Sequence, residues 1–416
     1  MSKHVIEDAK RCLQCKTPRC QQGCPAHTQI REFIHLLLLS RIEEAGKMLY
    51  QNNPLSLVCS YVCPQENQCE GHCVLGAKGS PVQISAIEKY ISDYYLNIYH
   101  PVPSTRENGK VAIIGSGPAG ITIATLLSRY HYDVTIFEGN DHLGGVMRYG
   151  IPEFRLPKAV LDRMMDVLLK SGVRIRPNTS IGTNLNVDDL FRDGYQAVFI
   201  GTGVWRPSRL NIQGESLGNV HYAIEYLRNP DVYRLGKRLA VIGVGNVAMD
   251  VARTAFRHGC EEVWIIGNLE EEDITARPVE LEFAKIDGAK LMMGKSTVAF
   301  VDEGVMLADS RIVAGPDGRR RAEPIPDTEQ LLPVDSSIIA IGQGPRAVIV
   351  SSTEGIEVSR KGLVAVDALG RTTRKGVFAS GDVVTGAKTV VGAMQLSKQV
   401  AEEMHRYVQT GEWPGE

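Results

Sequence analysis

The chain has 416 residues, with 46 Lys and Arg against 48 Asp and Glu, and a formal net charge of −2. This length exceeds one ordinary core, so two or three domains are expected. The balanced charge includes no basic block, which argues against nucleic-acid binding. The longest apolar run, residues 36–39, is too short for membrane insertion, and the polar first ten residues do not form a secretory signal. We therefore predict a cytoplasmic protein.

Eight of the nine cysteines lie within the first 73 residues, and Cys260 stands apart from them. A reducing cytosol disfavours disulfides, and a chain of this length does not need them. The eight follow the patterns C-x2-C-x4-C-x3-C-P and C-x3-C-P-x4-C-x3-C. Structural zinc usually shows two tight C-x2-C pairs, whereas staggered runs with Cys-Pro are typical of iron–sulfur proteins. We predict two [4Fe–4S] clusters, with zinc or purely structural thiols as the alternatives.

Helical segments surround these cysteines. The stretch 30–54 has apolar residues at helical spacing and stops at Asn-Asn-Pro, and the stretch 84–99 predicts one more helix. Residues 100–110, which contain Pro, Ser and Gly, predict a linker. The first part of the chain is therefore expected to be a small helical domain over residues 1–105.

A glycine loop follows the linker. The β-branched run 111–114 leads into Gly115, Gly117 and Gly120, then a helical pattern, then a second strand that ends at Glu138. In a dinucleotide-binding unit the first glycine permits the turn, the second lets backbone amides approach a pyrophosphate, and the third lets helix and strand pack closely. Glu138 is placed to accept a hydrogen bond from a ribose hydroxyl.

The segment GVFASGD, residues 376–382, follows an apolar strand near the C-terminus and places Asp382 where a carboxylate can hold a ribityl hydroxyl. The same Asp382 can instead cap the helix that follows. With this segment the chain resembles flavoproteins in which an FAD domain is interrupted by a pyridine-nucleotide domain. Further candidate contacts to FAD are Pro118, Ala119, Gly381, Thr389 and Val390.

A second glycine loop begins about 130 residues after the first. Gly243, Gly245 and Ala248 form G-x-G-x-x-A between a strand and a helix, with Asn246 and Val247 inside the loop.

The residues after the next strand discriminate between nicotinamide cofactors. Gly267 and Asn268 precede a run of four acidic residues, 270–273, which would repel the 2′-phosphate of NADP(H). Asn268 or one of these acids can bind a free ribose hydroxyl. The sequence favours NAD(H), and Arg253 and Arg277 keep NADP(H) open as the alternative.

The order of cysteine domain, FAD half, nicotinamide domain and FAD half resembles the small subunit of bacterial glutamate synthase. It is also similar to the N-terminal electron-input part of dihydropyrimidine dehydrogenase, including its stand-alone bacterial subunit. The segments that carry the resemblance are CLQCKTPRCQQGCP (12–25), VCSYVCPQENQCEGHC (58–73), VAIIGSGPAG (111–120), LGGVMRYGIPEFRLPK (143–158), VIGVGNVAMDVART (241–254) and GVFASGD (376–382).

The resemblance implies an α/β fold with an N-terminal α-helical bis-[4Fe–4S] domain and two Rossmann-like dinucleotide-binding domains. Residues 110–230 and 345–416 would form the FAD domain, and residues 231–344 the NAD(P) domain. Gly144, Gly145, Arg148 and Tyr149 would lie near the flavin. Relatives that use NADPH carry two arginines at the positions of Gly267 and Asn268, so the chain departs from them there.

The resemblance also implies how the cluster ligands divide. One cluster would take Cys12, Cys15, Cys20 and Cys73. The other would take Cys24, Cys63, Cys69 and, from the following helix, Glu88. This division leaves Cys59 unassigned, and the sequence permits Cys59 as the fourth ligand in place of Glu88.

No pair of cysteines follows the flavin motifs, so electrons that leave FAD have no dithiol to reduce. We expect hydride to pass from NAD(P)H to FAD and single electrons to pass through the clusters to a separate catalytic subunit in a hetero-oligomer. That partner would contain FMN, iron–sulfur clusters or both. No catalytic residue is expected beyond the cofactor ligands. Two alternatives are a subunit of an electron-bifurcating NADH-dependent ferredoxin:NADP oxidoreductase and a nicotinamide-inactive scaffold that holds clusters and FAD.

Overall fold

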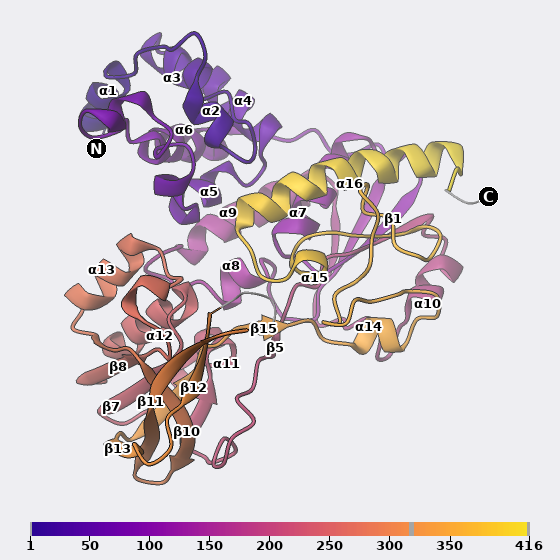
Figure 1. Cartoon of the computed structure of the whole chain (residues 1–416). Coiled ribbons are helices and arrows are strands. Elements are labelled where there is room, and N and C mark those ends of the chain that lie inside the picture. Colours follow the sequence, from indigo (N-terminus) through magenta and orange to yellow (C-terminus); the bar gives the residue numbers. More distant parts are fainter. Residues whose placement is uncertain (1, 316–319, 414–416) are drawn as a thin grey trace. The chain divides into compact units, whose positions relative to one another are not determined.

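The computed structural model describes residues 2–315 and 320–413, which form two compact units (Figure 1). Unit 1 contains the described residues of 1–148, 153–204 and 345–416, and unit 2 contains 149–152 and 205–344. Unit 1 therefore joins the cysteine-rich segment to both parts of the first nucleotide fold. Residues 205–230 belong to unit 2.

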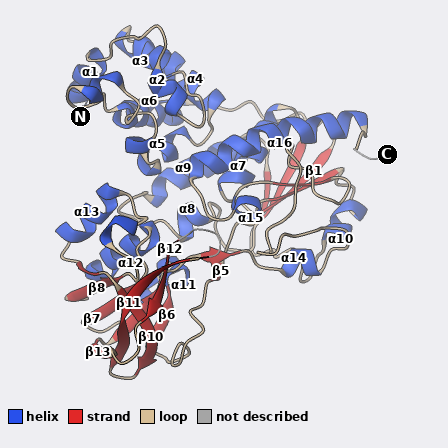
Figure 2. Cartoon of the chain, viewed as in Figure 1, coloured by secondary structure: helices blue, strands red, loops and turns tan. Residues whose placement is uncertain are grey.

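The described residues before Lys110 form helices and no strand (Figure 2). Apolar side chains of four of these helices, including Phe33, Leu49 and Ile87, make one buried core. The stretch 30–54 forms two helices, because Ser40 has a left-handed backbone conformation (φ 61°) between them. The helices are α1 (Ser2–Lys10), α2 (Arg19–Gly23), α3 (Ile30–Leu38), α4 (Ile42–Asn52), α5 (Ser56–Val62) and α6 (Ile84–Ile98), with the 3₁₀ turns η1 (Gln65–Asn67) and η2 (Val74–Ala77).

The rest of unit 1 is built on a parallel five-stranded sheet in the order β16-β4-β1-β2-β3. The strands β1, β4 and β16 are buried and mostly apolar because helices cover a parallel sheet on both faces, whereas the edge strand β3 has two exposed arginines. The strands are β1 (Lys110–Ile114), β2 (Asp133–Phe137), β3 (Arg174–Arg176), β4 (Ala197–Ile200) and β16 (Val377–Ala379). The helices are α7 (Pro118–Arg129), α8 (Val146–Tyr149), which reaches into unit 2, α9 (Lys158–Lys170), α10 (Val187–Arg192), α14 (Val348–Ser351), α15 (Asp382–Thr385) and α16 (Val390–Thr410).

Unit 2 contains a second parallel sheet, ordered β6-β14-β7-β8-β9. An antiparallel group of four strands, which the sequence patterns did not predict, follows β9. The strands are β5 (Arg206–Pro207), β6 (Val220–Tyr222), β7 (Arg238–Ile242), β8 (Glu262–Ile266), β9 (Lys290–Met292), β10 (Lys295–Val301), β11 (Gly304–Ala314), β12 (Arg320–Pro324), β13 (Gln330–Pro333), β14 (Ser336–Ile339) and β15 (Gln343–Gly344). The helices are α11 (Ala223–Arg228), α12 (Asn246–Arg257) and α13 (Pro278–Ile286), with η3 (Pro230–Val232) and η4 (Glu271–Asp273).

The two parallel sheets and the helical N-terminal part confirm the predicted fold class. Within residues 2–315 and 320–413, no helix combines the length and apolar character needed to cross a bilayer.

Candidate functional site

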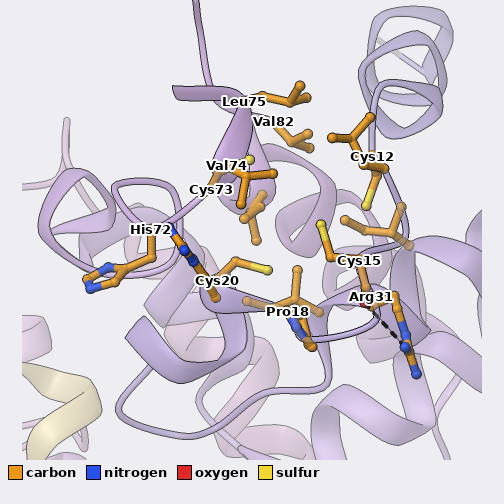
Figure 3. A pocket seen from close by; sticks show the side chains of 15 residues that line it. Cys12, Cys15, Pro18, Cys20, Arg31, His72, Cys73, Val74, Leu75 and Val82 are labelled. Carbon is orange, nitrogen blue, oxygen red and sulfur yellow. Dashed lines mark hydrogen bonds between the residues drawn. The ribbon is translucent and has the colours of Figure 1, made fainter. Parts of the chain in front are cut away.

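Four cysteines face one pocket in the helical part of unit 1 (Figure 3). Cys12, Cys15, Cys20 and Cys73 line it together with apolar side chains such as Ile30. Its empty volume is about 430 Å³, including the part that is open to solvent. Cys20 lies on α2 and Cys73 directly before η2, so chain segments about fifty residues apart supply the thiols.

The electrostatics of this pocket favour a bound cation. Burial and, to a smaller extent, the neighbouring thiols raise the pKa of the Cys12 and Cys20 thiols, that of Cys20 to about 11. Four thiolates so close together repel one another unless positive charge lies between them. Iron supplies that charge, so the donor set of the pocket fits an iron–sulfur cluster.

A second group of thiols lies close to one carboxyl group. The pKa values of Cys24, Cys63 and Cys69 are all raised, and the negative charge of Glu88 contributes to each shift. Burial likewise raises the pKa of Glu88 to about 8. In the described chain no hydrogen bond or ion pair is found for the Glu88 side chain. These three thiols and the Glu88 carboxyl group therefore also suit a cationic cluster as ligands.

Cys59 lies at the edge of this second group. Its buried sulfur accepts a hydrogen bond from Asn53 Nδ2 at 3.3 Å, and it forms a hydrogen bond with the Cys63 thiol. The hydrogen bond with Cys59 is the largest cause of the raised pKa of Cys63, and the charge of Glu88 contributes at all three thiols. Both Cys59 and Glu88 thus lie close enough to these thiols to supply the fourth ligand.

The described residues contain no set of three or more His, Cys, Asp or Glu side chains placed to hold one metal ion. A tetrahedral zinc site needs four donors around a single ion, at about 2.3 Å for sulfur. A four-iron cluster instead binds each cysteine to a different iron. Among the described residues, the thiols are therefore not gathered around a point that a single zinc ion could occupy.

The first glycine loop connects β1 to α7. Gly115 has a left-handed φ of 96°, and a methyl group on Gly120 would lie 2.0 Å from the Gly115 carbonyl oxygen, so packing requires both glycines. A methyl group on Gly117 would instead meet no protein atom closer than 4.0 Å. The protein's own packing thus leaves space at Gly117, in front of the N-terminus of α7 and its Pro118. This is the arrangement that receives a pyrophosphate.

Glu138 is fixed at the end of β2 by four hydrogen bonds. Its Oε2 accepts from the Ser116 backbone N–H (3.0 Å) and hydroxyl (2.5 Å), and its Oε1 accepts from the Asn140 backbone (2.8 Å) and side chain (2.7 Å). The role of Ser116 was not predicted from the sequence, although this residue lies within the GSGPAG motif. The carboxylate is held beside the glycine loop, where a ribose is expected.

Two distant segments pack onto this loop. Gly145 has a left-handed φ of 51°, and a methyl group there would lie 2.7 Å from the Gly117 Cα. Gly381 packs against Ala119, with only 3.0 Å between the Ala119 Cβ and a Cβ placed on Gly381. The structure thus brings the predicted flavin residues of 115–120, 144–148 and 381–390 together in unit 1.

The remaining flavin candidates border these segments. Arg148 donates from Nε to the Leu143 carbonyl oxygen (2.7 Å) and pairs with Asp162. Thr389 caps α16 by accepting from the Gly392 N–H at 3.2 Å, and Val390 is the first residue of that helix.

Asp382 opens α15 and accepts a hydrogen bond from the Lys388 N–H at 3.2 Å. Burial raises its pKa from the ordinary 3.8 to about 6. A hydroxyl donor from a ligand would therefore stabilise its ionised form.

Unit 2 repeats the loop geometry. Gly243 has a left-handed φ of 126°, and a methyl group there would meet the Ala340 carbonyl oxygen at 2.4 Å. At Gly245 the nearest protein atom, Thr275 Oγ1, would be 3.6 Å away, so this position is open in front of α12. Asn246 accepts a hydrogen bond from the Arg277 N–H at 2.8 Å. Val247 packs against the core beneath the loop, which includes the buried Ala248.

The acidic residues after β8 form ion pairs with an arginine that was not predicted to lie beside them. Arg320, on β12, pairs with Glu270 (2.5 Å) and Asp273 (3.1 Å). The preceding Gly267 is buried, and Asn268 is exposed. The arginine-rich run at 319–321 was the available signal, but it lies about fifty residues further along the chain.

Arg253 and Arg277, the other candidate phosphate ligands, also have acidic partners. Arg253 pairs with Glu280 (3.2 Å) and Asp287 (3.1 Å), and Arg277 lies 3.7 Å from Glu280. Carboxylates therefore already surround the cations that a 2′-phosphate would need.

Comparisons with known proteins agree with this architecture. The family model of dihydropyrimidine dehydrogenase domain II, 4Fe–4S cluster, matches residues 1–98, and the pyridine nucleotide-disulphide oxidoreductase model matches residues 109–397. The glutamate synthase [NADPH] small chain of Escherichia coli is 31% identical, over 96% of this chain and 91% of that protein. The NAD-dependent dihydropyrimidine dehydrogenase subunit PreT of the same species is 32% identical, over 97% and 94%.

Solved structures support the flavoprotein fold. Mycobacterium tuberculosis FprA, in complex with NADPH, superposes with a TM-score of 0.62 at 18% identity, covering 73% of this chain and 85% of that one. The thioredoxin reductase of T. acidophilum superposes with a TM-score of 0.57 at 20% identity, covering 72% of this chain and 98% of that one.

We predict that Glu88→Ala lowers the iron content to about half, because the second cluster loses its fourth ligand. Cys59→Ala should retain the wild-type content. The test is the iron and acid-labile sulfide content of both variants after anaerobic purification. Loss of iron only in the Cys59 variant would show that the assignment of Glu88 is wrong.

The raised pKa of Asp382 predicts a pH-dependent stability of the FAD-free chain. Because the folded state favours the protonated carboxyl, Asp382 contributes to the free energy of unfolding. This contribution is fully present below pH 3.8 and is lost as pH rises through about 6. Asp382→Asn should therefore stabilise the FAD-free chain, by on the order of 3 kcal/mol at pH 8 and less at pH 5.

Urea unfolding of the flavin-stripped protein at the two pH values measures this effect. Asp302→Asn, on an exposed turn of unit 2, is the control. An equal effect of Asp382→Asn at both pH values would contradict the raised pKa of Asp382 in the folded chain.

Proposed function

The chain belongs to the family of FAD- and NAD(P)-dependent iron–sulfur oxidoreductases that includes the glutamate synthase small chains, and on that premise we propose that it is an electron-input subunit. In this function it oxidises NAD(P)H, with a preference for NADH. The electrons pass through FAD and two [4Fe–4S] clusters to a catalytic partner subunit. That partner contains FMN, iron–sulfur clusters or both, and the two chains form a hetero-oligomer.

The observation that carries this proposal is the position of the cysteines. Eight of the nine lie in the helical part of unit 1, in the same compact unit as the flavin loops. The ninth, Cys260, is buried in unit 2, where its thiol donates to the Gly236 carbonyl oxygen at 3.5 Å. Cys260 therefore has no second thiol in unit 2 with which to form a redox dithiol, which supports the cysteines of the helical part as the electron acceptors.

The chain's own residues position the cofactors. FAD supplies the conversion of a two-electron hydride donor to one-electron acceptors. The amides at Gly117 and the N-terminus of α7 bind its pyrophosphate, Glu138 accepts from its ribose, and Asp382 accepts from its ribityl chain. Gly245 and the N-terminus of α12 bind the nicotinamide dinucleotide. Since these groups bind and orient, no acid–base residue is needed.

The exposed cysteine pocket is the proposed exit. Leu13, beside Cys12, is 61% exposed, and the neighbouring Lys16 and Arg19 are also exposed. The Cys24 group is linked instead to α16 of the flavin fold, because Thr28 and Asn52 connect them. The partner subunit would dock at the Cys12 pocket.

We expect anaerobic NADH to bleach the flavin absorbance and to produce the electron paramagnetic resonance (EPR) signals of reduced clusters. Gly245→Val should abolish both changes, because the new side chain occupies the open nucleotide position, where its Cβ would meet only Thr275 Oγ1, in ordinary contact at 3.6 Å. Dithionite should still reduce the clusters of this variant. An unchanged flavin spectrum in the wild type would contradict the proposal.

The acidic partners of Arg253, Arg277 and Arg320 support NADH as the preferred donor. We expect flavin reduction to be about tenfold faster with NADH than with NADPH at equal subsaturating concentrations, equivalent to about 1.4 kcal/mol. The double variant Glu270→Gln/Asp273→Asn frees Arg320 and should increase the rate with NADPH.

Glu303→Gln, on the exposed turn between β10 and β11, is the matched control for removal of an acid. Faster reduction of the wild type by NADPH would show that the assignment to NADH is wrong.

A further inference from the structure

Three polar side chains connect the flavin fold to Cys24. The Thr28 hydroxyl lies 3.4 Å from the Cys24 sulfur. Asn52 Nδ2 donates to Thr28 Oγ1 at 3.2 Å and to the Ala26 carbonyl oxygen at 3.2 Å. Lys398 Nζ, from α16, donates to Asn52 Oδ1 at 3.0 Å. A continuous set of hydrogen bonds thus runs from an ammonium group to a proposed cluster ligand.

The chemistry of the ligand fixes the direction of these bonds. A cysteine bound to iron is a thiolate and has no proton to donate. The Thr28 hydroxyl must therefore donate to the sulfur, which leaves its oxygen to accept from Asn52. The Asn52 oxygen in turn accepts from Lys398. All the donors then point from the ammonium group toward the sulfur, so each bond polarises the next.

The position of Asn52 is firmly held. Lys398 also donates to the Asn52 backbone oxygen at 2.9 Å. Arg129, at the end of α7, donates to the Tyr50 and Gln51 carbonyl oxygens at 3.2 and 3.4 Å. These are the last carbonyls of α4, which carry the negative end of the helix dipole. Two cations of the flavin fold therefore cap this helix and keep the Asn52 amide in place.

Lys398 is half-buried, and burial lowers its pKa. The like charge of Arg129 also lowers the pKa of Lys398, whereas the negative charges of Glu402 and Cys24 raise it. A cation in this position is thus stabilised by negative charge on the Cys24 side.

We propose that Lys398, acting through Asn52 and Thr28, raises the reduction potential of the cluster held by Cys24, Cys63, Cys69 and Glu88. The inference rests on the proposed function, because it requires this cluster to be bound. A cluster gains one negative charge on reduction, and hydrogen bonds to its sulfurs and nearby charge set its potential. Lys398 is a positioning residue that favours arrival of an electron at this cluster.

Redox titration of the full chain, followed by EPR, tests the proposal. In Lys398→Met and Thr28→Val the ratio of reduced to oxidised Cys24 cluster should fall about tenfold at a fixed potential, which corresponds to about 59 mV for one electron. Thr28→Ser keeps the hydroxyl and should retain the wild-type ratio. The double variant should fall no further than Thr28→Val alone, because Thr28 is the link through which Lys398 acts.

Two internal controls accompany the titration. Lys47→Met removes an equal charge from the exposed face of α4 and should leave the ratio unchanged. The cluster at the Cys12 pocket should also titrate as in the wild type. Unchanged ratios in both single variants, equal shifts of both clusters, or additive effects in the double variant would each overturn the proposal.

Iron and sulfide analysis separates this inference from the proposed function. A wild-type protein without the second cluster contradicts the function itself. A protein with both clusters and unaltered ratios in the variants contradicts only the role of Lys398.

Discussion

Repulsion between buried, negatively charged ligands is the constraint on which the helical part of this protein depends. Burial disfavours the ionised forms of several of the thiols, such as Cys20, and of Glu88. A cationic cluster would instead favour the ionised forms, which are the ones that bind iron. Apolar helices surround them and exclude the water that would otherwise solvate the charge. Cluster binding and the packing of these helices are therefore parts of one equilibrium.

The two nucleotide folds use glycine in two different ways. At Gly120 and Gly243 a side chain would collide with the protein's own backbone, so packing alone explains these residues. At Gly117 and Gly245 the protein leaves the space open at the N-terminus of a helix, so packing alone does not require glycine there. The distinction gives a physical reason to place a dinucleotide in each unit. It also shows that neither loop has been filled by protein atoms.

Local patterns predicted much of this architecture because the cluster and glycine motifs are contiguous. The β1–α7–β2 and β7–α12–β8 units, α6 and α16 all follow from runs of neighbouring residues. The antiparallel strands β10–β13 were missed, since their pairing depends on contacts that no single segment encodes. The break at Ser40 and the ion pairs of Arg320 depend in the same way on tertiary context. Thr28, Asn52 and Lys398 have no common motif, and only the folded chain brings them together.

Because Arg129 and Lys398 cap α4, the helical segment and the flavin fold are not independent parts of this protein. Known flavoproteins with the same fold cover about three quarters of the chain, and the helical segment lies outside the pyridine nucleotide-disulphide oxidoreductase match. Excision of that segment would leave two half-buried cations facing solvent without the carbonyl oxygens that now accept from them. The flavin fold has thus become adapted to its N-terminal neighbour, and an isolated flavin module would need its α7 and α16 surfaces redesigned.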